Sequence, residues 1–319
     1  MQTGRMRLGV LDIGSNTVHL LVVDAHRGGH PTPTFDDRAV LRLAEHVGRD
    51  EVLSKAGEKA LVSAVRKACK RAEEQDCDEV LALVTSAIRE AVNGMEVLDR
   101  VRSQTGVDLQ VTSGEEEARL TFLAVRRWYG WSAGRLLVLD IGGGSLELAS
   151  GVDEDPEVAL SVPLGAGRMT RRFLPEAATG GRPDLTALTA LREHASDVLR
   201  PAAKKLRGAG APDLVAATSK TFRTLARLTG AAPYSAGLRV PRELSADGLD
   251  QLIGFVSRIE SRALAELRGV SPDRAHQVPA GAVVAQAAMQ ALDLPSVRIC
   301  PWALREGVIL RRLDSLGGA

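Results

Sequence analysis

Two aspartates stand at the ends of apolar runs, and a turn of small residues follows each of them. Asp12 lies in LDIGSNTVHLLV, and Asp140 lies in LDIGGGSLEL. Such a turn after a buried strand lets main-chain N–H groups approach a phosphate, because few Cβ atoms stand in the way. A carboxylate there repels phosphate unless a cation lies between them, and Mg²⁺ is typically held by one or two carboxylates with water and phosphate oxygens. Either motif alone is more often a simple turn, but the pair predicts a phosphate and metal site.

Three consecutive acids open a helical segment, SGEEEARLTFLA, and their positions separate them. Glu115 can pair with Arg119 four residues on, and Glu116 with Ser113 fits a capping box. Both of these acids therefore have structural explanations.

Glu117 has no such explanation, because its helical neighbours form an inward face: Leu120, Thr121 and Ala124. A carboxylate on an inward face is a candidate general base. The alternative is a simple favourable interaction with the helix dipole. We favour the general base.

Several cations follow expected strands and could bind phosphate oxygens. Arg89 lies in TSAIREAVN, Arg168 lies in PLGAGRMT, and Lys220 and Arg223 lie in ATSKTFRTLA. A guanidinium can bind two phosphate oxygens at once. For each cation taken alone, a surface salt bridge is the alternative.

The elements that must position these residues alternate as in α/β proteins. Apolar runs at 7–11 and 18–24 flank the first turn too closely for a helix between them, so they predict an antiparallel hairpin. Runs at 136–141 and 147–150 predict a second hairpin around the glycine turn, so the second half resembles the first. Further strands are expected at 79–85, 108–112 and 297–300, with a strand, turn and helix at 213–228. Helices are expected at 54–74, 96–105, 113–128, 185–206, 249–267, 280–291 and 303–313.

Composition limits the function classes. The 319 residues carry a net charge of +1 and few aromatic side chains, which disfavours a dedicated nucleic-acid binder. Cys69, Cys77 and Cys300 show no metal spacing, and neither do the six histidines. No apolar run reaches the roughly 18 residues of a membrane span, and the N-terminus lacks a signal-peptide pattern. We therefore expect a cytoplasmic protein that binds neither nucleic acid nor membrane.

The ordered set of motifs resembles the exopolyphosphatase and guanosine pentaphosphate phosphohydrolase (Ppx/GppA) family of the actin, Hsp70 and sugar kinase superfamily. The resemblance covers nearly the whole chain. Its markers here are DIGSNTVHLLV, TSAIREAVN, SGEEEARLTFLA, DIGGGSLEL, PLGAGRMT, ATSKTFRTLA and CPWALREGVIL. It implies two ribonuclease-H-like (actin-like ATPase) α/β domains with the active site in the cleft between them. We expect the first domain at 1–125, joined by the C-terminal helix 303–319, and the second at 126–302.

The resemblance also implies roles for single residues. Glu117 activates the attacking water, and Arg89 binds substrate phosphate. Asp140 and Glu147 are implied to hold a divalent metal, Mg²⁺ or another, and the pair of turns described above predicts Asp12 as a further metal residue. The residues expected to bind substrate phosphate are Gly14, Ser15, Asn16, Thr17, Gly143, Gly144, Ser145 and Arg168.

The chain departs from the family pattern at two positions. Leu146 stands where the family commonly has Thr, which removes one hydroxyl from the loop. Lys220 replaces a glycine usual in the superfamily's nucleotide motif, and its side chain could obstruct an adenosine. Longer members append a helical C-terminal module, which we do not expect in this protein.

We therefore expect an exopolyphosphatase that hydrolyses the terminal phosphoanhydride of inorganic polyphosphate with Mg²⁺ and favours short chains. Alternatives are guanosine pentaphosphate phosphohydrolase activity, or an actin-like nucleotide-binding regulator without catalysis. The family often forms homodimers, and composition does not test that.

Overall fold

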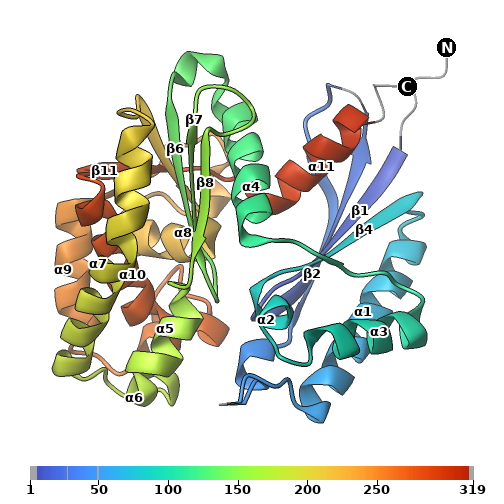
Figure 1. The fold of residues 1–319 in the computed structure, drawn as a ribbon, viewed down its shortest axis with the longest axis horizontal. Coiled ribbons are helices and arrows are strands. Elements are labelled where there is room, and N and C mark those ends of the chain that lie inside the picture. Colours follow the sequence, from blue (N-terminus) through green and yellow to red (C-terminus); the bar gives the residue numbers. More distant parts are fainter. Residues whose placement is uncertain (1–5, 27, 49, 316–319) are drawn as a thin grey trace. The chain divides into compact units, whose positions relative to one another are not determined.

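The computed structural model describes residues 6–26, 28–48 and 50–315 (Figure 1). The chain divides into two compact units, the first formed by residues 1–120 with 304–319 and the second by 121–303. The sequence placed these boundaries at 125/126 and 302/303.

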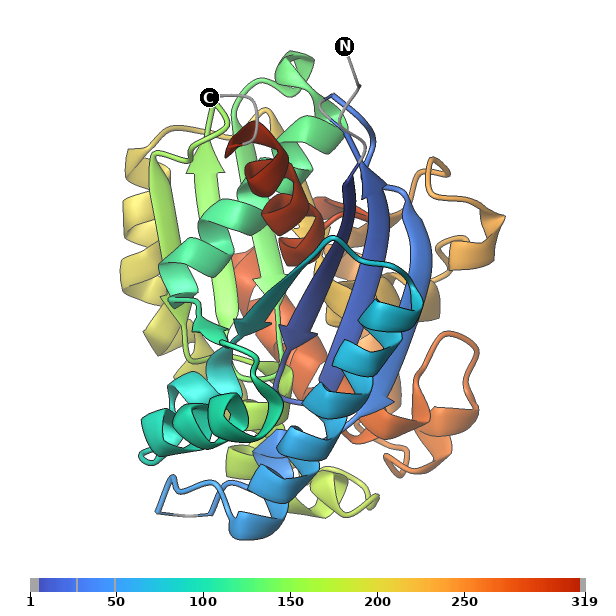
Figure 2. The same ribbon diagram turned by 90° about the vertical axis from the view of Figure 1, so that its right-hand side faces the viewer.

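The first unit is built on a five-stranded mixed sheet in the order β3-β2-β1-β4-β5. Its strands are β1 (Met6–Ile13), β2 (Thr17–Ala25), β3 (Pro33–Val40), β4 (Glu79–Val84) and β5 (Gln110–Val111). The predicted hairpin is confirmed, because β1 and β2 pair antiparallel, whereas β4 runs parallel to β1. The strand β3 was not predicted, because its sequence PTFDDRAV is polar and it lies exposed at the sheet edge. Figure 2 shows these strands side by side.

Helices bury both faces of this sheet, which explains why β1 and β2 are apolar almost throughout. One face packs against α1 (Lys55–Glu74) and α3 (Gly94–Thr105), and the other against α11 (Leu304–Ser315). The helix α1 begins where Ser54 Oγ accepts a hydrogen bond from the Gly57 amide at 3.2 Å. At the start of α11, a Cβ added to Gly307 would clash with the Leu120 carbonyl of α4 (Gly114–Tyr129). The close approach of these two helices therefore requires glycine.

The second unit repeats this topology. Its sheet has the order β10-β11-β9-β6-β7-β8. The strands are β6 (Leu136–Ile141), β7 (Leu146–Gly151), β8 (Val158–Val162), β9 (Leu214–Thr218), β10 (Glu243–Ser245) and β11 (Ser296–Ile299). Counted from β8, the order β8-β7-β6-β9-β11 matches β3-β2-β1-β4-β5, and the parallel and antiparallel pairs also match. The expected resemblance of the two halves is confirmed, and β10 is an additional edge strand.

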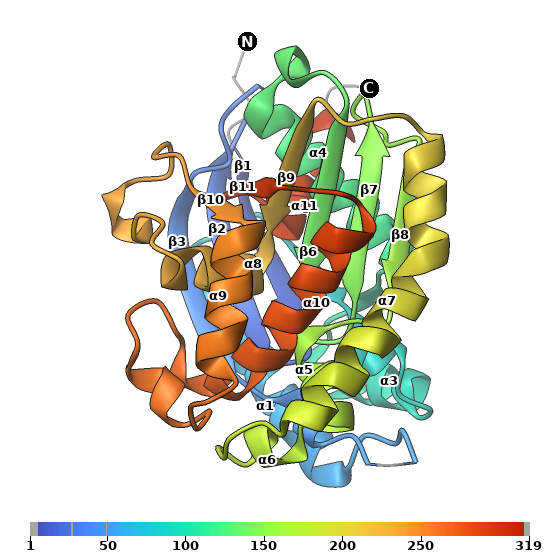
Figure 3. The same ribbon diagram turned by 90° about the vertical axis from the view of Figure 1, so that its left-hand side faces the viewer.

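Helices α7 (Leu185–Gly208), α9 (Ala246–Val256) and α10 (Val278–Ala291) cover one face of the second sheet (Figure 3). Most of α10 is buried, because it packs among other helices as well as on the sheet. The helix predicted at 249–267 is wrong beyond residue 256. There the amides of Ser261 and Arg262 donate to the Gly181 and Gly180 carbonyls, so long-range hydrogen bonds replace helical ones.

None of the three cysteines forms a disulfide in the described part of the chain, and burial raises the pKa of the Cys69 and Cys77 thiols. No helix among the described residues is both long and apolar enough to cross a membrane.

Candidate active site

The turn between β1 and β2, called loop 1 (Gly14–Thr17), is closed by a hydrogen bond from the Gly14 amide to the Thr17 carbonyl at 2.9 Å. Ser15, Asn16 and Thr17 are buried, which is unusual for polar turn residues. The Asn16 carbonyl accepts hydrogen bonds from the Leu41 and Arg42 amides, both at 2.9 Å, which anchor loop 1 to the end of β3. Loop 1 is therefore a fixed element of the first unit.

The turn between β6 and β7, called loop 2 (Gly142–Ser145), has the same closure. The Gly142 amide donates to the Ser145 carbonyl at 2.9 Å. The carbonyls of Gly143 and Gly144 point toward α5 (Ala166–Phe173), where they accept from the Arg168 amide at 2.9 Å and from Arg168 Nε at 2.8 Å respectively. Among the described residues, no oxygen accepts a hydrogen bond from the Gly143 or Gly144 amide. These two N–H groups of loop 2 can therefore donate hydrogen bonds to an anion.

Glycine is required where α5 meets loop 2. A Cβ on Gly165 would clash with the backbone of Gly144 and Ser145. Arg168, which was expected to bind substrate phosphate, contacts loop 2. Its amide and Nε hold loop 2, and its part in phosphate binding stays a prediction.

Asp140 and Glu147 lie directly opposite each other on β6 and β7. Glu147 is buried, and its Oε1 accepts a hydrogen bond from Ser161 Oγ at 2.8 Å. A Cβ on Gly142 would lie 4.0 Å from Glu147 Oε2, so this carboxylate borders loop 2. The equivalent pair of the first hairpin is Asp12 opposite His19, where an imidazole replaces the second carboxylate.

The chemistry of the Asp140 and Glu147 pair suits a hard divalent cation. Mg²⁺ prefers oxygen ligands and often takes only one or two carboxylates, with water and phosphate completing the set. Among residues 6–26, 28–48 and 50–315, no group of three or more His, Cys, Asp or Glu side chains forms a metal site. The part of Asp12 in metal binding stays a prediction.

Glu117 lies in the first turn of α4, and its side chain is only 10% exposed. It forms an ion pair with Arg89, whose Nη1 also donates to the Thr112 carbonyl at 2.7 Å. The expected inward face is confirmed, because Leu120, Thr121 and Ala124 are all buried. The structure thus brings together the two residues expected to carry catalysis.

Ser86 was missed by sequence reasoning. It opens α2 (Ser86–Arg89), and its Oγ lies 2.8 Å from Ser15 Oγ. The Thr85 amide also donates to the Ile13 carbonyl at 3.1 Å. The segment that carries Arg89 is therefore bonded directly to loop 1. The sequence signal that could have indicated Ser86 is the pair of hydroxyl residues, Thr85 and Ser86, directly after β4, the strand that pairs with β1.

The acid that precedes Glu117, Glu116, lies in the same first turn of α4. Ser113 Oγ accepts from the Glu116 amide at 3.1 Å, which confirms the helix cap. The carboxylate of Glu116 instead binds Arg311 of α11 at 2.5 Å, so the reciprocal half of the capping box is wrong. A distant arginine offers this exposed carboxylate a charged partner.

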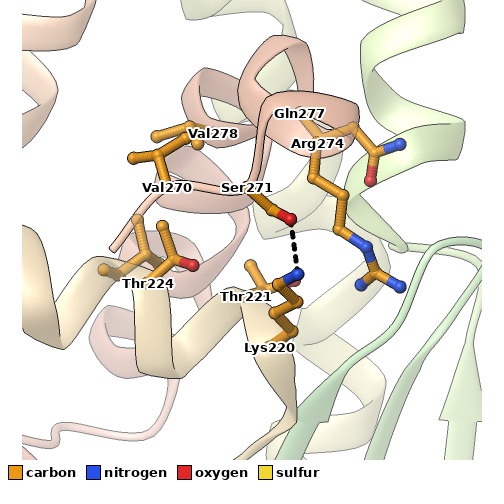
Figure 4. A pocket seen from close by; sticks show the side chains of 9 residues that line it. Lys220, Thr221, Thr224, Val270, Ser271, Arg274, Gln277 and Val278 are labelled. Carbon is orange, nitrogen blue, oxygen red and sulfur yellow. Dashed lines mark hydrogen bonds between the residues drawn. The ribbon is translucent and has the colours of Figure 1, made fainter. Parts of the chain in front are cut away.

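The later cations lie on α8 (Ser219–Leu228). Lys220 Nζ donates to Ser271 Oγ at 2.6 Å (Figure 4). Arg223 Nε donates to the Ser219 carbonyl at 3.1 Å, and its guanidinium lies 5.5 Å from the ring centre of Tyr234. Arg223 therefore has a structural role in the second unit.

Comparison with known proteins gives consistent matches. The model of the Ppx/GppA phosphatase family matches residues 22–316. Exopolyphosphatase 1 of Mycobacterium bovis is 59% identical over 310 residues, which cover 97% of this chain and 89% of that protein. Exopolyphosphatase 1 of Mycobacterium leprae is 57% identical, with coverage of 97% and 90%.

Two solved structures share the fold. A crystal structure of an exopolyphosphatase from Cytophaga hutchinsonii has a TM-score of 0.85 at 22% identity and covers 97% of this chain and 98% of that one. The Aquifex aeolicus member of the Ppx/GppA family has a TM-score of 0.81 at 23% identity, with coverage of 98% and 99%. The two-unit α/β architecture is common to all three chains.

Proposed function

Because this chain belongs to the Ppx/GppA phosphatase family, we propose that it is an exopolyphosphatase that releases orthophosphate from the end of inorganic polyphosphate. The observation that carries this conclusion is 59% identity, over 97% of the chain, to proteins named Exopolyphosphatase 1. The residues of loop 1, loop 2 and α4 also support hydrolysis of a phosphoanhydride.

Glu117 serves as the general base. Its carboxylate is nearly buried and is held by Arg89, so its orientation is fixed before substrate arrives. The carboxylate takes a proton from a water molecule, and the water attacks the terminal phosphorus in line with the bond that breaks. A fixed base avoids the cost of ordering this side chain during the reaction.

Charge on the phosphate is stabilised by groups that are already in place. The Arg89 guanidinium binds phosphate oxygens. Its Nη1 donates a hydrogen bond to the Thr112 carbonyl and forms the ion pair with Glu117. In the second unit the Gly143 and Gly144 amides and Arg168 bind phosphate oxygens. Loop 1 contributes Gly14 and the polar residues Ser15, Asn16 and Thr17. Donors that are preorganised in this way stabilise the transition state more than mobile water does.

Asp140 and Glu147 are the residues that would hold Mg²⁺, and the pairing of the two Asp-containing turns suggests the same role for Asp12. When bound, the cation supplies charge neutralisation for the departing phosphate oxygen. Ser161 keeps the Glu147 carboxylate oriented through its 2.8 Å hydrogen bond.

Phosphate release measured side by side from polyphosphate, guanosine pentaphosphate and ATP tests the proposal. With Mg²⁺ present, we expect orthophosphate from polyphosphate at a rate well above that from either nucleotide. Release from guanosine pentaphosphate alone would assign the chain to the other activity of the family. Binding of a nucleotide without release from any substrate would favour a regulator.

A further inference from the structure

Two buried serine hydroxyls of the first unit bond to each other at loop 1. Ser15 lies in loop 1 and Ser86 opens α2, and their Oγ atoms lie 2.8 Å apart. The two residues are only 7% and 5% exposed, respectively. Polar side chains that are buried to this degree generally have hydrogen-bond partners for their polar atoms. The hydrogen bonds of this pair therefore show whether the chain itself satisfies both hydroxyls.

The pair has one more O–H group than the chain satisfies. A serine hydroxyl donates one hydrogen bond and can accept two. One O–H group is used between the two oxygens, whichever serine is the donor. Among residues 6–26, 28–48 and 50–315, no other atom forms a hydrogen bond with either hydroxyl. A buried donor that lacks an acceptor destabilises a protein, so the second O–H group is suited to an acceptor that the ligand brings.

The sheet of the first unit fixes the two oxygens in place. Ile13 and Val84 lie opposite each other on the parallel strands β1 and β4, and Ser15 and Ser86 each follow two residues later. Both the amide and Oγ1 of Thr85 donate to the Ile13 carbonyl, at 3.1 and 3.4 Å. The positions of the two Oγ atoms are thus set by the backbone, and only the direction of each O–H group can vary.

The second unit has no counterpart of this pair. Ser15 is the third residue after Asp12, whereas the third residue after Asp140 is Gly143. Loop 2 offers N–H groups instead, and the backbone itself sets their direction. A hydroxyl proton, in contrast, rotates about the bond between Cβ and Oγ. The hydroxyl in loop 1 therefore needs a second group to direct its proton.

We infer that Ser86 is a positioning residue, which donates its proton to Ser15 Oγ and so directs the Ser15 O–H group toward an oxygen of the bound phosphate. The inference rests on the proposed function, which takes loop 1 as a phosphate-binding loop. A hydrogen bond to a charged oxygen is stronger than one between neutral groups. A hydroxyl that already accepts a hydrogen bond is also the better donor, because hydrogen bonds in a chain polarise one another. Ser86 needs no contact with the substrate for this effect.

A double-mutant cycle on Ser15 and Ser86 tests the inference. Isothermal titration calorimetry at fixed Mg²⁺ would use a triphosphate whose bridging oxygens are replaced by methylene groups, so that no turnover occurs. Ser15→Ala should weaken binding on the order of tenfold and Ser86→Ala about threefold. The double variant should bind no more weakly than Ser15→Ala does, because Ser86 acts through the hydroxyl that is already missing.

The salt dependence of binding separates this role from an effect on Arg89, which lies on the same short helix. Serine hydroxyls carry no charge, so Ser86→Ala should show the same salt dependence as wild type. A displaced Arg89 would instead lower the salt dependence by about one charge.

Three further variants complete the design. Ser86→Thr keeps a hydroxyl and should restore most of the affinity that Ser86→Ala loses. Ser63→Ala removes an exposed hydroxyl of α1 in the same unit and should change nothing. If thermal melting shows that Ser86→Ala is poorly folded, Ser86→Cys takes its place in the cycle, because a thiol is a weak donor of similar size.

A loss from Ser86→Ala that is as large in the Ser15→Ala background as in wild type would overturn the inference, because Ser86 would then act independently of Ser15. Unchanged affinity in Ser86→Ala, or a reduced salt dependence, would also overturn it. If the wild-type protein binds the methylene-bridged triphosphate but releases no orthophosphate from polyphosphate, the proposed function fails, whereas the cycle still decides the role of Ser86.

Discussion

Replacing Glu117 by Gln separates the chemical role of this residue from its structural role. Gln keeps the size of the side chain, and its Oε1 can still accept a hydrogen bond from Arg89. It cannot take a proton from water. Loss of a general base typically lowers the rate by about 10²–10⁴, which is about 3–5 kcal/mol in the barrier.

The structural cost of the same change should be smaller. The side chains of Arg89 and Glu117 are 19% and 10% exposed, and Arg89 also binds the Thr112 carbonyl. Weakening one charge-assisted hydrogen bond while both groups keep partners should cost on the order of 1–2 kcal/mol of unfolding free energy. We therefore expect a folded protein that binds polyphosphate and turns it over very slowly.

Phosphate release at saturating polyphosphate, calorimetric binding and thermal unfolding should be measured on the same preparations. Glu116→Gln is the matched control, since it changes the preceding acid, which pairs with Arg311 on the surface and touches no expected substrate group. This control should keep the wild-type turnover and lose no more than about 1 kcal/mol of stability. If turnover of Glu117→Gln stays within about threefold of wild type, the assignment of the base is wrong.

Three further predictions concern the metal pair, a helix contact and the course of hydrolysis. Asp140→Asn and Glu147→Gln should each raise the Mg²⁺ concentration for half-maximal phosphate release by at least about tenfold, since each removes a charged oxygen ligand; full wild-type activity in excess chelator would contradict this. Gly307→Ala should lower the free energy of unfolding in urea by about 1–3 kcal/mol, because its Cβ meets the Leu120 carbonyl. Gly208→Ala, where a Cβ meets open space, is the control, and equal stability of the two variants would show that α11 and α4 can separate at no cost. Hydrolysis should be distributive and favour short or medium chains, because few cations prolong the binding path; gel analysis under substrate excess should show a smoothly shortening population, and full-length chains beside terminal products alone would indicate processive action.

The sequence predicted those parts of the molecule that depend on local order. The two hairpins follow from apolar runs around glycine turns, and the inward position of Glu117 follows from helical spacing alone. Ser86 and the Glu116–Arg311 pair escaped prediction because their partners lie 71 and 195 residues away. The same reason applies to residues 257–262, where the hydrogen bonds reach back to Gly180 and Gly181. The polar strand β3 pairs only along one edge, so no apolar pattern marks it.

Among the three cross-strand pairs nearest the two turns, one pair differs in charge between the repeated hairpins, and that difference bears on how the protein recognises chain ends. Two identical halves would offer a polyanion two equivalent directions of binding. Here Glu147 faces Asp140, whereas His19 faces Asp12 and is bonded to Asp36 at 2.9 Å. After an ancestral duplication, this change of one carboxylate to an imidazole, or the reverse, would give the two copies unlike charges toward a ligand. A polymer would then have a defined orientation, and its terminus could be told apart from its interior.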